Sequence, residues 1–324
     1  MKSKVLIAGQ EGMVGSSLYR FLKKKNFKII ECKRKDLDFT NQLAVEKWFK
    51  KNRPNIVINA AGRVGGILDN KNFQPDFLYI NSIIGLNIIH SAAKFNVNKL
   101  INLGSACIYP KKTTQPIKEK KLLSSNLEET NEGYALAKIL ALKYSQHLRR
   151  KDNKNFISLM PANLYGEGDN FDLKSSHVLP ALVKKFALAK LNNIPIVEVW
   201  GTGRAKREFL NVEDLSSAIY FVLKKKINQD YLNIGGGEHV SIKKIALMLK
   251  KIIGYKGKII FNKKYPDGVK RRQLDSSIIK KLGWRPKIDL KAGLEKYYNY
   301  YLNKIYPNER PTYSYIGQLS KQNK

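Results

Sequence analysis

A tyrosine and a lysine four residues apart are the strongest chemical signal in the chain. Tyr134 and Lys138 share one face of the helix expected to begin near residue 132, so both side chains can act on one bound group. A phenol with the usual pKa of about 10 is a poor proton donor near neutral pH, and a neighbouring ammonium group is expected to lower that pKa. The pair therefore predicts proton transfer. For an isolated motif of this kind, a solvated helix with one i, i+4 pair is the alternative.

A serine at the end of an apolar run favours the chemical interpretation. Residues 99–103 read Lys-Leu-Ile-Asn-Leu, and Gly104 and Ser105 follow directly. In an open α/β fold, ligands bind at the carboxyl ends of the strands. We therefore expect the Ser105 hydroxyl at the ligand-binding edge of the sheet.

Three glycines near the amino terminus indicate a dinucleotide site. Gly9, Gly12 and Gly15 follow an apolar run at 5–8 that suits a buried parallel strand. Glycines at this spacing allow a tight turn, a close approach of the backbone to a pyrophosphate, and a helix whose free N–H groups face the phosphates. A strand, turn and helix without a ligand is the alternative for the motif alone. We expect cofactor contacts from the whole turn: Gly9, Gln10, Glu11, Gly12, Met13, Val14 and Gly15.

These residues need a parallel sheet to bring them together, and the pattern of the first 165 residues predicts one. Short apolar runs predict strands at 4–8, 27–31, 55–59, 99–103 and 157–160. Amphipathic stretches between them predict helices that begin near residues 12, 41, 76 and 132. This alternation is typical of an α/β protein with a Rossmann-type doubly wound parallel sheet.

The second half of the chain is less regular and predicts a smaller C-terminal α/β domain. Helices are expected at 180–191, 212–223 and 241–253, the last with Ser241 as its N-cap. Strands are expected at 196–200, 231–235 and 258–261, and the strand at 231–235 is expected to return to the first sheet. The last segment, 307–324, reads as a tail to which we assign no role.

Length and composition are typical of a globular intracellular protein. At 324 residues the chain exceeds the size at which one hydrophobic core usually divides, and its hydrophobic content of 43% is typical of globular proteins. Two cysteines, Cys32 and Cys107, provide no disulfide framework, which favours a reducing cytoplasm. No signal-peptide pattern is present, and no apolar run approaches the roughly 18 residues of a membrane helix. We expect a cytoplasmic protein without a membrane partner or a metal site.

The formal net charge of +34 raises the question of nucleic-acid binding. The lysines are scattered in pairs and triplets, as at 23–25, 111–112 and 224–226, and they form no stripe with interleaved aromatic residues. We therefore expect a solvated basic surface without specific nucleic-acid binding. Such a surface would still attract anionic substrates and cofactors.

The glycine turn and the Ser105, Tyr134 and Lys138 set resemble the extended branch of the short-chain dehydrogenase/reductase family, which acts on sugar nucleotides. Within that branch, the motifs are most similar to those of the GDP-L-fucose synthases. The similarity runs in register from about Val5 to the helix near Tyr300, over motifs that begin with Ala60, Gly104, Met160, Ser176 and Arg207. Cys107 within GSACIYP and His177 within SHVLPAL are the parts specific to the fucose synthase group.

This resemblance implies an epimerisation followed by a reduction. The implied substrate is GDP-4-keto-6-deoxy-D-mannose, and the implied product is GDP-L-fucose. Cys107 and His177 would form the acid–base pair that inverts carbons 3 and 5. Tyr134 would protonate the carbonyl oxygen, Ser105 would hydrogen-bond to it, and Lys138 would hold the nicotinamide ribose. For an isolated cysteine or histidine, core packing would be the more common role.

The resemblance also implies the domain organisation. It places an NADP-binding domain at 1–165, to which segments near 208–236 return, and a mainly substrate-binding domain at 166–306. Further cofactor contacts are expected from Leu103, Gly104, Pro161, Ala162, Asn163, Leu164 and His177. A homodimer is expected because paired helices usually dimerise in this family.

Residues after the second strand favour NADPH over NADH. Lys33, Arg34 and Lys35 stand where an NAD enzyme more often has an acid, and Arg34 can hold a 2′-phosphate. Glu11 within the glycine turn opposes this preference, since its carboxylate would repel that phosphate.

Four residues are expected to bind the GDP-sugar. Lys185 and Arg207 would meet the diphosphate, Trp200 would offer an apolar face, and Asp267 would accept from nucleotide hydroxyls. The alternatives are surface charge for Lys185, an ion pair with Glu208 for Arg207, core packing for Trp200 and an ordinary turn for Asp267. For the whole chain, two alternatives remain: another sugar-nucleotide epimerase or dehydratase, and a non-catalytic dinucleotide-binding scaffold that binds RNA.

Overall fold

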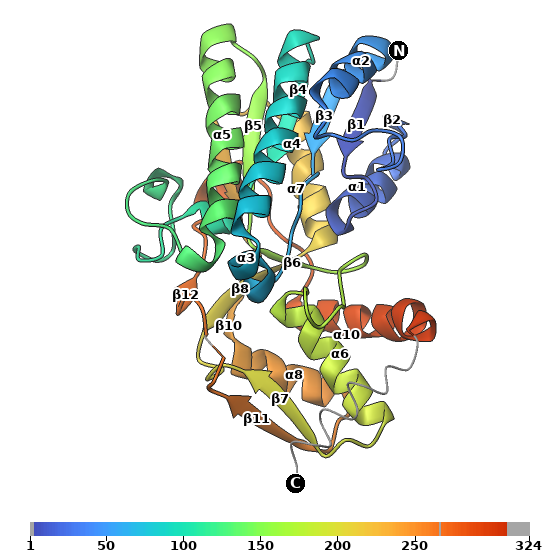
Figure 1. The fold of residues 1–324 in the computed structure, drawn as a ribbon, viewed down its shortest axis with the longest axis vertical. Helices are drawn as coiled ribbons and strands as arrows, with labels where there is room; N and C mark the ends of the chain where they lie inside the picture. Colours follow the sequence, from blue (N-terminus) through green and yellow to red (C-terminus); the bar gives the residue numbers. More distant parts are fainter. Residues whose placement is uncertain (1–2, 266, 310–324) are drawn as a thin grey trace.

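Six parallel strands form the central sheet of the upper part of the molecule in Figure 1. The structure is a computed structural model that describes residues 3–265 and 267–309. The strands run in the order β2-β1-β3-β4-β5-β9, and every neighbouring pair is parallel. Their bounds are β1 Lys4–Ala8, β2 Lys28–Ile30, β3 Ile56–Asn59, β4 Lys99–Leu103, β5 Phe156–Pro161 and β9 Tyr231–Ile234.

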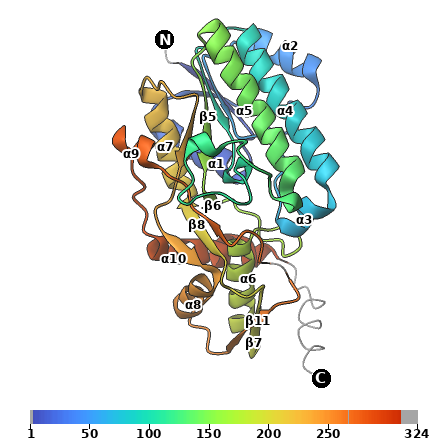
Figure 2. The same ribbon diagram turned by 90° about the vertical axis from the view of Figure 1, so that its left-hand side faces the viewer.

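Helices cover both faces of this sheet, because strands such as β1 have apolar side chains on both faces. Its consecutive residues Ile7 and Ala8 point to opposite faces and belong to different hydrophobic clusters. The first cluster includes residues of α1 and α7, and the other includes residues of α2 and α4. Figures 1 and 2 show α4 and α5 side by side on one face. The helices are α1 Met13–Lys24, α2 Gln42–Asn52, α4 Gln74–Lys94, α5 Glu132–Asp152 and α7 Val212–Lys224.

The lower part of the molecule has its own hydrophobic core and two smaller sheets. Strands β7 (Ile196–Trp200) and β11 (Lys258–Asn262) pair in parallel. Strand β8 (Lys206–Asn211) pairs with β6, β10 and β12. The remaining strands are β6 Asn163–Tyr165, β10 His239–Ser241 and β12 Arg271–Arg272. The helices are α6 Val178–Leu191, α8 Ile242–Ile253 and α10 Leu290–Tyr300.

Short elements connect these parts. Among them, α3 (Ile67–Asn72) lies between β3 and α4, and α9 (Ser277–Lys281) follows β12. The 3-10 turns are Ala106–Ile108, Glu119–Lys121, Glu129–Asn131 and Tyr306–Asn308, and a π-helical turn spans Tyr301–Ile305. Within the described residues, every helix is too short or too polar to cross a membrane.

The fold class expected from the sequence is confirmed, and the strand limits differ from the expected ones by one residue or so. Ser241 caps α8 as expected, since its Oγ accepts from the Lys244 N–H at 3.1 Å. Helix α4 begins at Gln74 instead of residue 76, because Pro75 is accommodated in its first turn. The sequence pattern did not predict α3, α9, β6, β8, β10 or β12. These elements are short, and periodicity is a weak signal over so few residues.

The domain limits at 165 and 306 stay a proposal. In the structure, α7 and β9 lie with the six-stranded sheet, whereas β8 belongs to the lower part. Most of the expected tail, residues 310–324, lies outside the described residues.

Candidate active site

The glycine turn joins β1 to α1 and leaves the helix terminus open to an anion. A Cβ on Gly15 would lie 2.0 Å from the Gly9 carbonyl oxygen, and one on Gly9, which has φ of +79°, would lie 2.8 Å from the Ala60 backbone. Only glycine allows these two approaches. Gly12 precedes α1, whose first turn has no acidic residue and no side-chain cap. Its free N–H groups and the helix dipole therefore suit a pyrophosphate.

The turn also holds the loop after β2, which carries Arg34. The Gln10 Oε1 accepts from the Cys32 N–H at 3.3 Å, and the Glu11 Oε2 accepts from the Arg34 N–H at 2.8 Å. The Glu11 carboxylate is thus bound to the backbone of the loop. Among the described residues, the Arg34 guanidinium has no ion-pair partner within 4.0 Å. This arrangement fits a cofactor that carries an additional phosphate.

Tyr134 and Lys138 lie together on α5, at the carboxyl end of β4. The Lys138 Nζ donates to the Leu103 carbonyl at 3.0 Å and lies 5.6 Å from the centre of the Tyr134 ring. Burial lowers the pKa of Lys138 to about 8. Burial also raises the pKa of Tyr134, and the nearby Cys107 acts in the same direction.

The expected pKa of Tyr134 is therefore wrong for the protein without substrate or cofactor. The spacing of the two residues predicts that Lys138 lowers the pKa of Tyr134, but desolvation of the phenolate raises that pKa in this structure. Desolvation weakens the positive charge of Lys138 as well. Tyr134 is thus a protonated phenol in the protein alone.

Cys107 lies on the 3-10 turn Ala106–Ile108, directly after β4. The Ser105 side chain caps this turn, since its Oγ accepts from the Cys107 N–H at 3.3 Å. Burial raises the pKa of the Cys107 thiol, while a hydrogen bond with Ser105 and the charges of Arg272 and Lys138 oppose that shift. The two candidate residues Ser105 and Cys107 thus share one turn with the ends of Tyr134 and Lys138 nearby.

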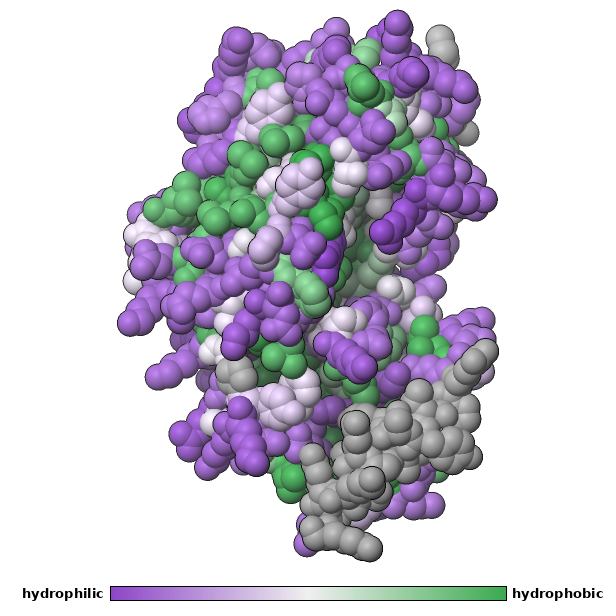
Figure 3. Space-filling model, in the orientation of Figure 1, coloured by the Kyte–Doolittle hydropathy of each residue, from purple (hydrophilic) through white to green (hydrophobic). Residues whose placement is uncertain are grey.

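His177 comes from the other part of the molecule, at the N-cap of α6. Its side chain is exposed to solvent, yet burial lowers its pKa. Protein atoms therefore lie close to the imidazole although part of the residue faces solvent. Figure 3 shows a hollow between the upper and lower parts on the face that it draws. The imidazole is neutral near neutral pH.

The segment 62–70 connects the two halves of the site, and the sequence analysis did not assign it a role. The Gly66 N–H donates to the Ser175 carbonyl at 2.8 Å, and a Cβ on Gly66 would lie 2.5 Å from the Ser176 oxygen. The Asn70 Nδ2 holds the Gly66 carbonyl at 3.0 Å. A Cβ on Gly62 would lie 3.6 Å from the Lys138 Nζ. The segment therefore reaches from Lys138 to the loop before His177, and its clustered glycines were the available sequence signal.

Trp200 at the end of β7 forms an open aromatic platform. It stacks on Tyr265 with ring centres 4.2 Å apart and planes 10° apart, and 39% of Trp200 is exposed. The Lys185 Nζ lies 4.9 Å from the Trp200 ring and donates to the Glu198 carbonyl at 3.1 Å. A cation over a flat apolar surface suits a nucleotide base or phosphate. Tyr265 was not expected from the sequence, since Tyr-Pro-Asp-Gly reads as an ordinary turn.

Arg207 and Asp267 organise the loop beside this platform. The Arg207 guanidinium donates to the carbonyls of Val269 at 2.5 Å and Asp267 at 3.2 Å. Both carboxylate oxygens of Asp267 accept from Thr202, at 2.7 and 2.6 Å. Glu208 binds the backbone of Leu274 instead of Arg207, so the ion pair considered as an alternative is not formed. Burial lowers the pKa of Arg207 to about 10, and the neighbouring Arg272 contributes.

The other expected cofactor contacts follow β4 and β5. Leu103 accepts from Lys138 as described, and the Gly104 N–H donates to the Leu159 carbonyl at 2.9 Å. Pro161 ends β5, Ala162 follows it, and Asn163 and Leu164 begin β6. The Asn163 Nδ2 donates to the Glu208 carbonyl at 2.9 Å and so joins the end of β5 to β8. All of these residues lie at the carboxyl ends of the strands, where open α/β sheets bind ligands.

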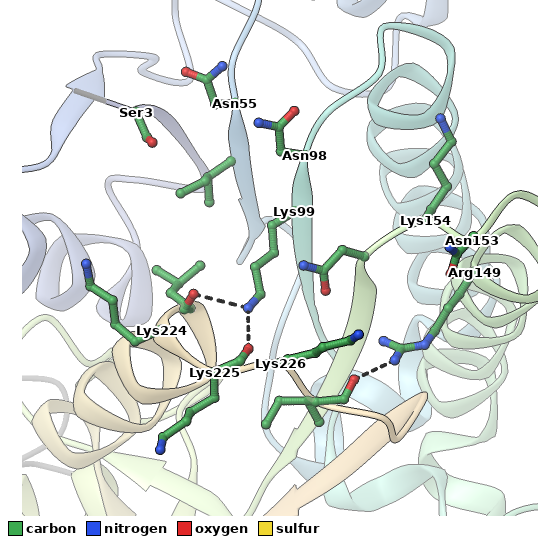
Figure 4. Close-up of a pocket in the computed structure, with 14 residues that line it drawn as sticks. Ser3, Asn55, Asn98, Lys99, Arg149, Asn153, Lys154, Lys224, Lys225 and Lys226 are labelled. Carbon is green, nitrogen blue, oxygen red and sulfur yellow. Dashed lines mark hydrogen bonds between the residues drawn. The ribbon is translucent and has the colours of Figure 1, made fainter. Parts of the chain in front are cut away.

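A cavity of about 600 Å³ lies at the opposite end of the sheet, where the strands begin (Figure 4). Lysines and asparagines line it, but the central cation is already bound. The Lys99 Nζ donates to the carbonyls of Val222, Leu223 and Lys225 at 2.5, 3.1 and 2.9 Å. These carbonyls end α7 and carry the negative end of its dipole, so they satisfy Lys99 and disfavour an anion. We assign the chemistry to the other end of the strands.

Comparisons with known proteins identify the family of this chain. The model of the NAD dependent epimerase/dehydratase family matches residues 5–235. A GDP-L-fucose synthase from Sinorhizobium fredii is 44% identical, with 94% of this chain and 97% of the relative covered. The crystal structure of a GDP-6-OMe-4-keto-L-xylo-heptose reductase from C. jejuni has a TM-score of 0.88 at 35% identity, with 94% and 98% covered. A GDP-L-fucose synthetase from Naegleria fowleri, bound to NADP, has a TM-score of 0.86 at 26% identity, with 95% of each chain covered.

Proposed function

Because this chain belongs to the NAD dependent epimerase/dehydratase family, we propose that it converts GDP-4-keto-6-deoxy-D-mannose to GDP-L-fucose with NADPH as reductant. The observation that carries this proposal is the thiol of Cys107 beside the Tyr134–Lys138 pair, with His177 presented from the other side. A simple reductase needs the tyrosine and lysine only. An additional acid–base pair is needed when carbons are also inverted. The GDP-L-fucose synthase from Sinorhizobium fredii, at 44% identity, supports the same assignment.

Inversion precedes reduction because the ketone makes it possible. A carbonyl at carbon 4 acidifies the hydrogens on carbons 3 and 5, so a base can remove one proton and an acid can return one to the opposite face. Cys107 and His177 form this pair. Burial keeps the imidazole neutral and the thiol protonated, so a proton can pass to one group and from the other near neutral pH.

Reduction uses the residues of the upper part. Bound NADPH supplies the hydride that reduces carbon 4. The buried phenol of Tyr134 donates its proton to the carbonyl oxygen, and Ser105 hydrogen-bonds to that oxygen. Lys138, fixed by the Leu103 carbonyl, orients the nicotinamide ribose. The glycine turn and the terminus of α1 hold the pyrophosphate.

The GDP-sugar lies across the lower part in this proposal. Lys185 and Arg207 neutralise its diphosphate, and Trp200 provides the apolar surface against which it packs. Asp267 is already bound to Thr202, so it contributes mainly by holding the loop and has its remaining lone pairs for nucleotide hydroxyls.

The test is an assay with GDP-4-keto-6-deoxy-D-mannose and NADPH, with the sugar product identified by NMR. We expect GDP-L-fucose. Reduction at carbon 4 without inversion would indicate a 4-keto reductase and exclude the epimerase half of the proposal. A non-catalytic scaffold would be favoured if the protein bound NADPH without oxidising it and also bound RNA tightly at physiological salt.

The preference for NADPH predicts a selective effect of Arg34→Ala. The substitution removes the cation that is free to bind the 2′-phosphate, so KM for NADPH should rise about tenfold or more while KM for NADH changes little. Steady-state kinetics with both cofactors check this. Lys28→Ala, at an exposed position on β2, is the matched control and should leave both values unchanged. An equal rise for the two cofactors would show that Arg34 acts only through the general field of the protein.

We also propose a homodimer formed through α4 and α5. Leu78 and Tyr79 on α4 and Leu136 and Leu140 on α5 are all exposed, and the two helices pack side by side. An apolar patch of this kind on paired helices suits a second copy of the same surface. Light scattering should give a dimer for the wild type and a monomer for Leu140→Glu. Leu247→Glu, at an exposed leucine on α8, is the control and should stay dimeric.

The proposed compartment is the cytoplasm. Both cysteines are free, and Cys107 must stay reduced to exchange protons in the proposed reaction. A reducing compartment meets this requirement.

A further inference from the structure

Arg272 joins the lower part of the molecule to the turn that carries Cys107. Its Nη1 donates to the Ala106 carbonyl at 2.6 Å and to the Tyr109 carbonyl at 3.2 Å. These two carbonyls stand on either side of Cys107 in the chain. One guanidinium from β12 therefore closes the turn that follows β4.

The strand that carries Arg272 is fixed on both sides. In the register of β12 and β8, Arg272 lies opposite Arg207. On its other side, the Ile117 N–H donates to the Gln273 carbonyl at 2.8 Å, and the Asp275 N–H donates to the Ile117 carbonyl at 2.8 Å. Because the backbone on both sides is hydrogen-bonded, the guanidinium has a defined position relative to the turn.

Arg272 is a largely surrounded cation with no carboxylate within 4.0 Å among residues 3–265 and 267–309. Burial lowers its pKa, and the nearby Cys107 and Glu128 oppose that shift. The two groups affect each other. Burial raises the pKa of the Cys107 thiol, and the positive charge of Arg272 opposes that rise. A half-buried cation without a carboxylate partner is costly, so its place beside a thiol calls for a role.

We propose that Arg272 is a positioning residue for Cys107, which fixes the turn and places a positive charge beside the sulfur. The other groups that face the thiol are Ser105 on the turn and Tyr134 and Lys138 on α5. Tyr134 is uncharged and Lys138 loses part of its charge through burial, so Arg272 is the permanent cation at the thiol. The position of Arg272 and its effect on the thiol do not depend on the proposed function. Only the reaction in which Cys107 exchanges its proton rests on that function.

Thiol alkylation tests the proposal without substrate or cofactor. The full chain is treated with iodoacetamide between about pH 6 and pH 10, and peptide mass spectrometry quantifies modification of Cys107, since the thiolate is the reactive form. In Arg272→Gln, which removes the charge but keeps a hydrogen-bond donor, the midpoint should move to higher pH, and the rate near pH 8 should fall about tenfold. In Arg272→Lys, which keeps the charge, the midpoint should stay near that of the wild type.

Arg271→Gln is the matched control. Arg271 is the preceding residue of β12 and is exposed, and its guanidinium donates to the Gln273 Oε1 at 2.9 Å. It should leave the alkylation profile unchanged. If circular dichroism shows that Arg272→Gln is unfolded, Arg272→Met repeats the measurement with a neutral side chain that still fills the space.

The proposal would be overturned if the alkylation midpoint in folded Arg272→Gln or Arg272→Met equalled that in Arg271→Gln. Arg272 would then have only a packing role. The proposal would extend to the reaction if the alkylation midpoint rose and the variant also lost deuterium exchange at carbons 3 and 5 at pH 7. That exchange should recover at higher pH. If the wild type makes no GDP-L-fucose, the proposed function fails, while the alkylation profile still decides the role of Arg272.

Discussion

Replacement of Tyr134 by phenylalanine should lower the rate of NADPH oxidation by about 10² to 10⁴, the range typical of general acid catalysis. The ring, which packs edge-on against Phe77 at 6.2 Å, stays in place, so only the donor is lost. Binding of the GDP-sugar should change little, because Tyr134 donates to the oxygen mainly as charge develops in the transition state. Steady-state and single-turnover kinetics measure the effect as a loss in kcat.

Tyr144→Phe is the matched control for this variant. Tyr144 lies on the same helix, and its hydroxyl contacts the His90 Nδ1 at 3.0 Å, away from the site. It should keep the wild-type kcat. Normal turnover by Tyr134→Phe would remove Tyr134 from the mechanism and would leave the reducing half of the proposal without a proton donor.

Replacement of Cys107 by serine should separate inversion from reduction. Serine keeps the size and hydrogen bonding of the side chain, but its hydroxyl is a far weaker acid than a thiol with the usual pKa of about 8.5. Proton exchange at carbons 3 and 5 should slow by about 10² or more, while Tyr134 and the cofactor site stay intact. The variant should release a sugar reduced at carbon 4 and uninverted at carbons 3 and 5, and NMR in heavy water should show less deuterium at those carbons.

Cys32→Ser is the control for loss of a thiol. Cys32 is buried just beyond β2, in the hydrophobic cluster that includes residues of α2 and α4, so its thiol does not line the proposed site. It should still make GDP-L-fucose. Thermal unfolding of both variants is compared first, since a buried substitution can reduce activity through stability alone. Full inversion and solvent exchange by folded Cys107→Ser would show that Cys107 is a packing residue.

The sequence by itself determined the central sheet and the identity of the main candidate residues. Strands such as 4–8 and 99–103 are mostly apolar, because a parallel sheet covered on both faces favours buried apolar residues. Local rules are enough here, since a glycine turn and a Tyr-Lys pair on one helix face depend on neighbours within a few residues. The resemblance to the GDP-L-fucose synthases is likewise confirmed by the relatives at up to 44% identity.

Only the tertiary structure decided what surrounds those residues. Arg272 is 165 residues beyond Cys107 in the chain, and Gly66 is more than 100 residues before the loop that it holds, so no local pattern links them. The pKa of Tyr134 also depends on tertiary structure, because the sequence shows the cation four residues away but not the desolvation that outweighs it. Hydrogen bonds and burial of this kind join side chains that are distant in sequence, and they exist only when the two parts of the chain are folded against each other.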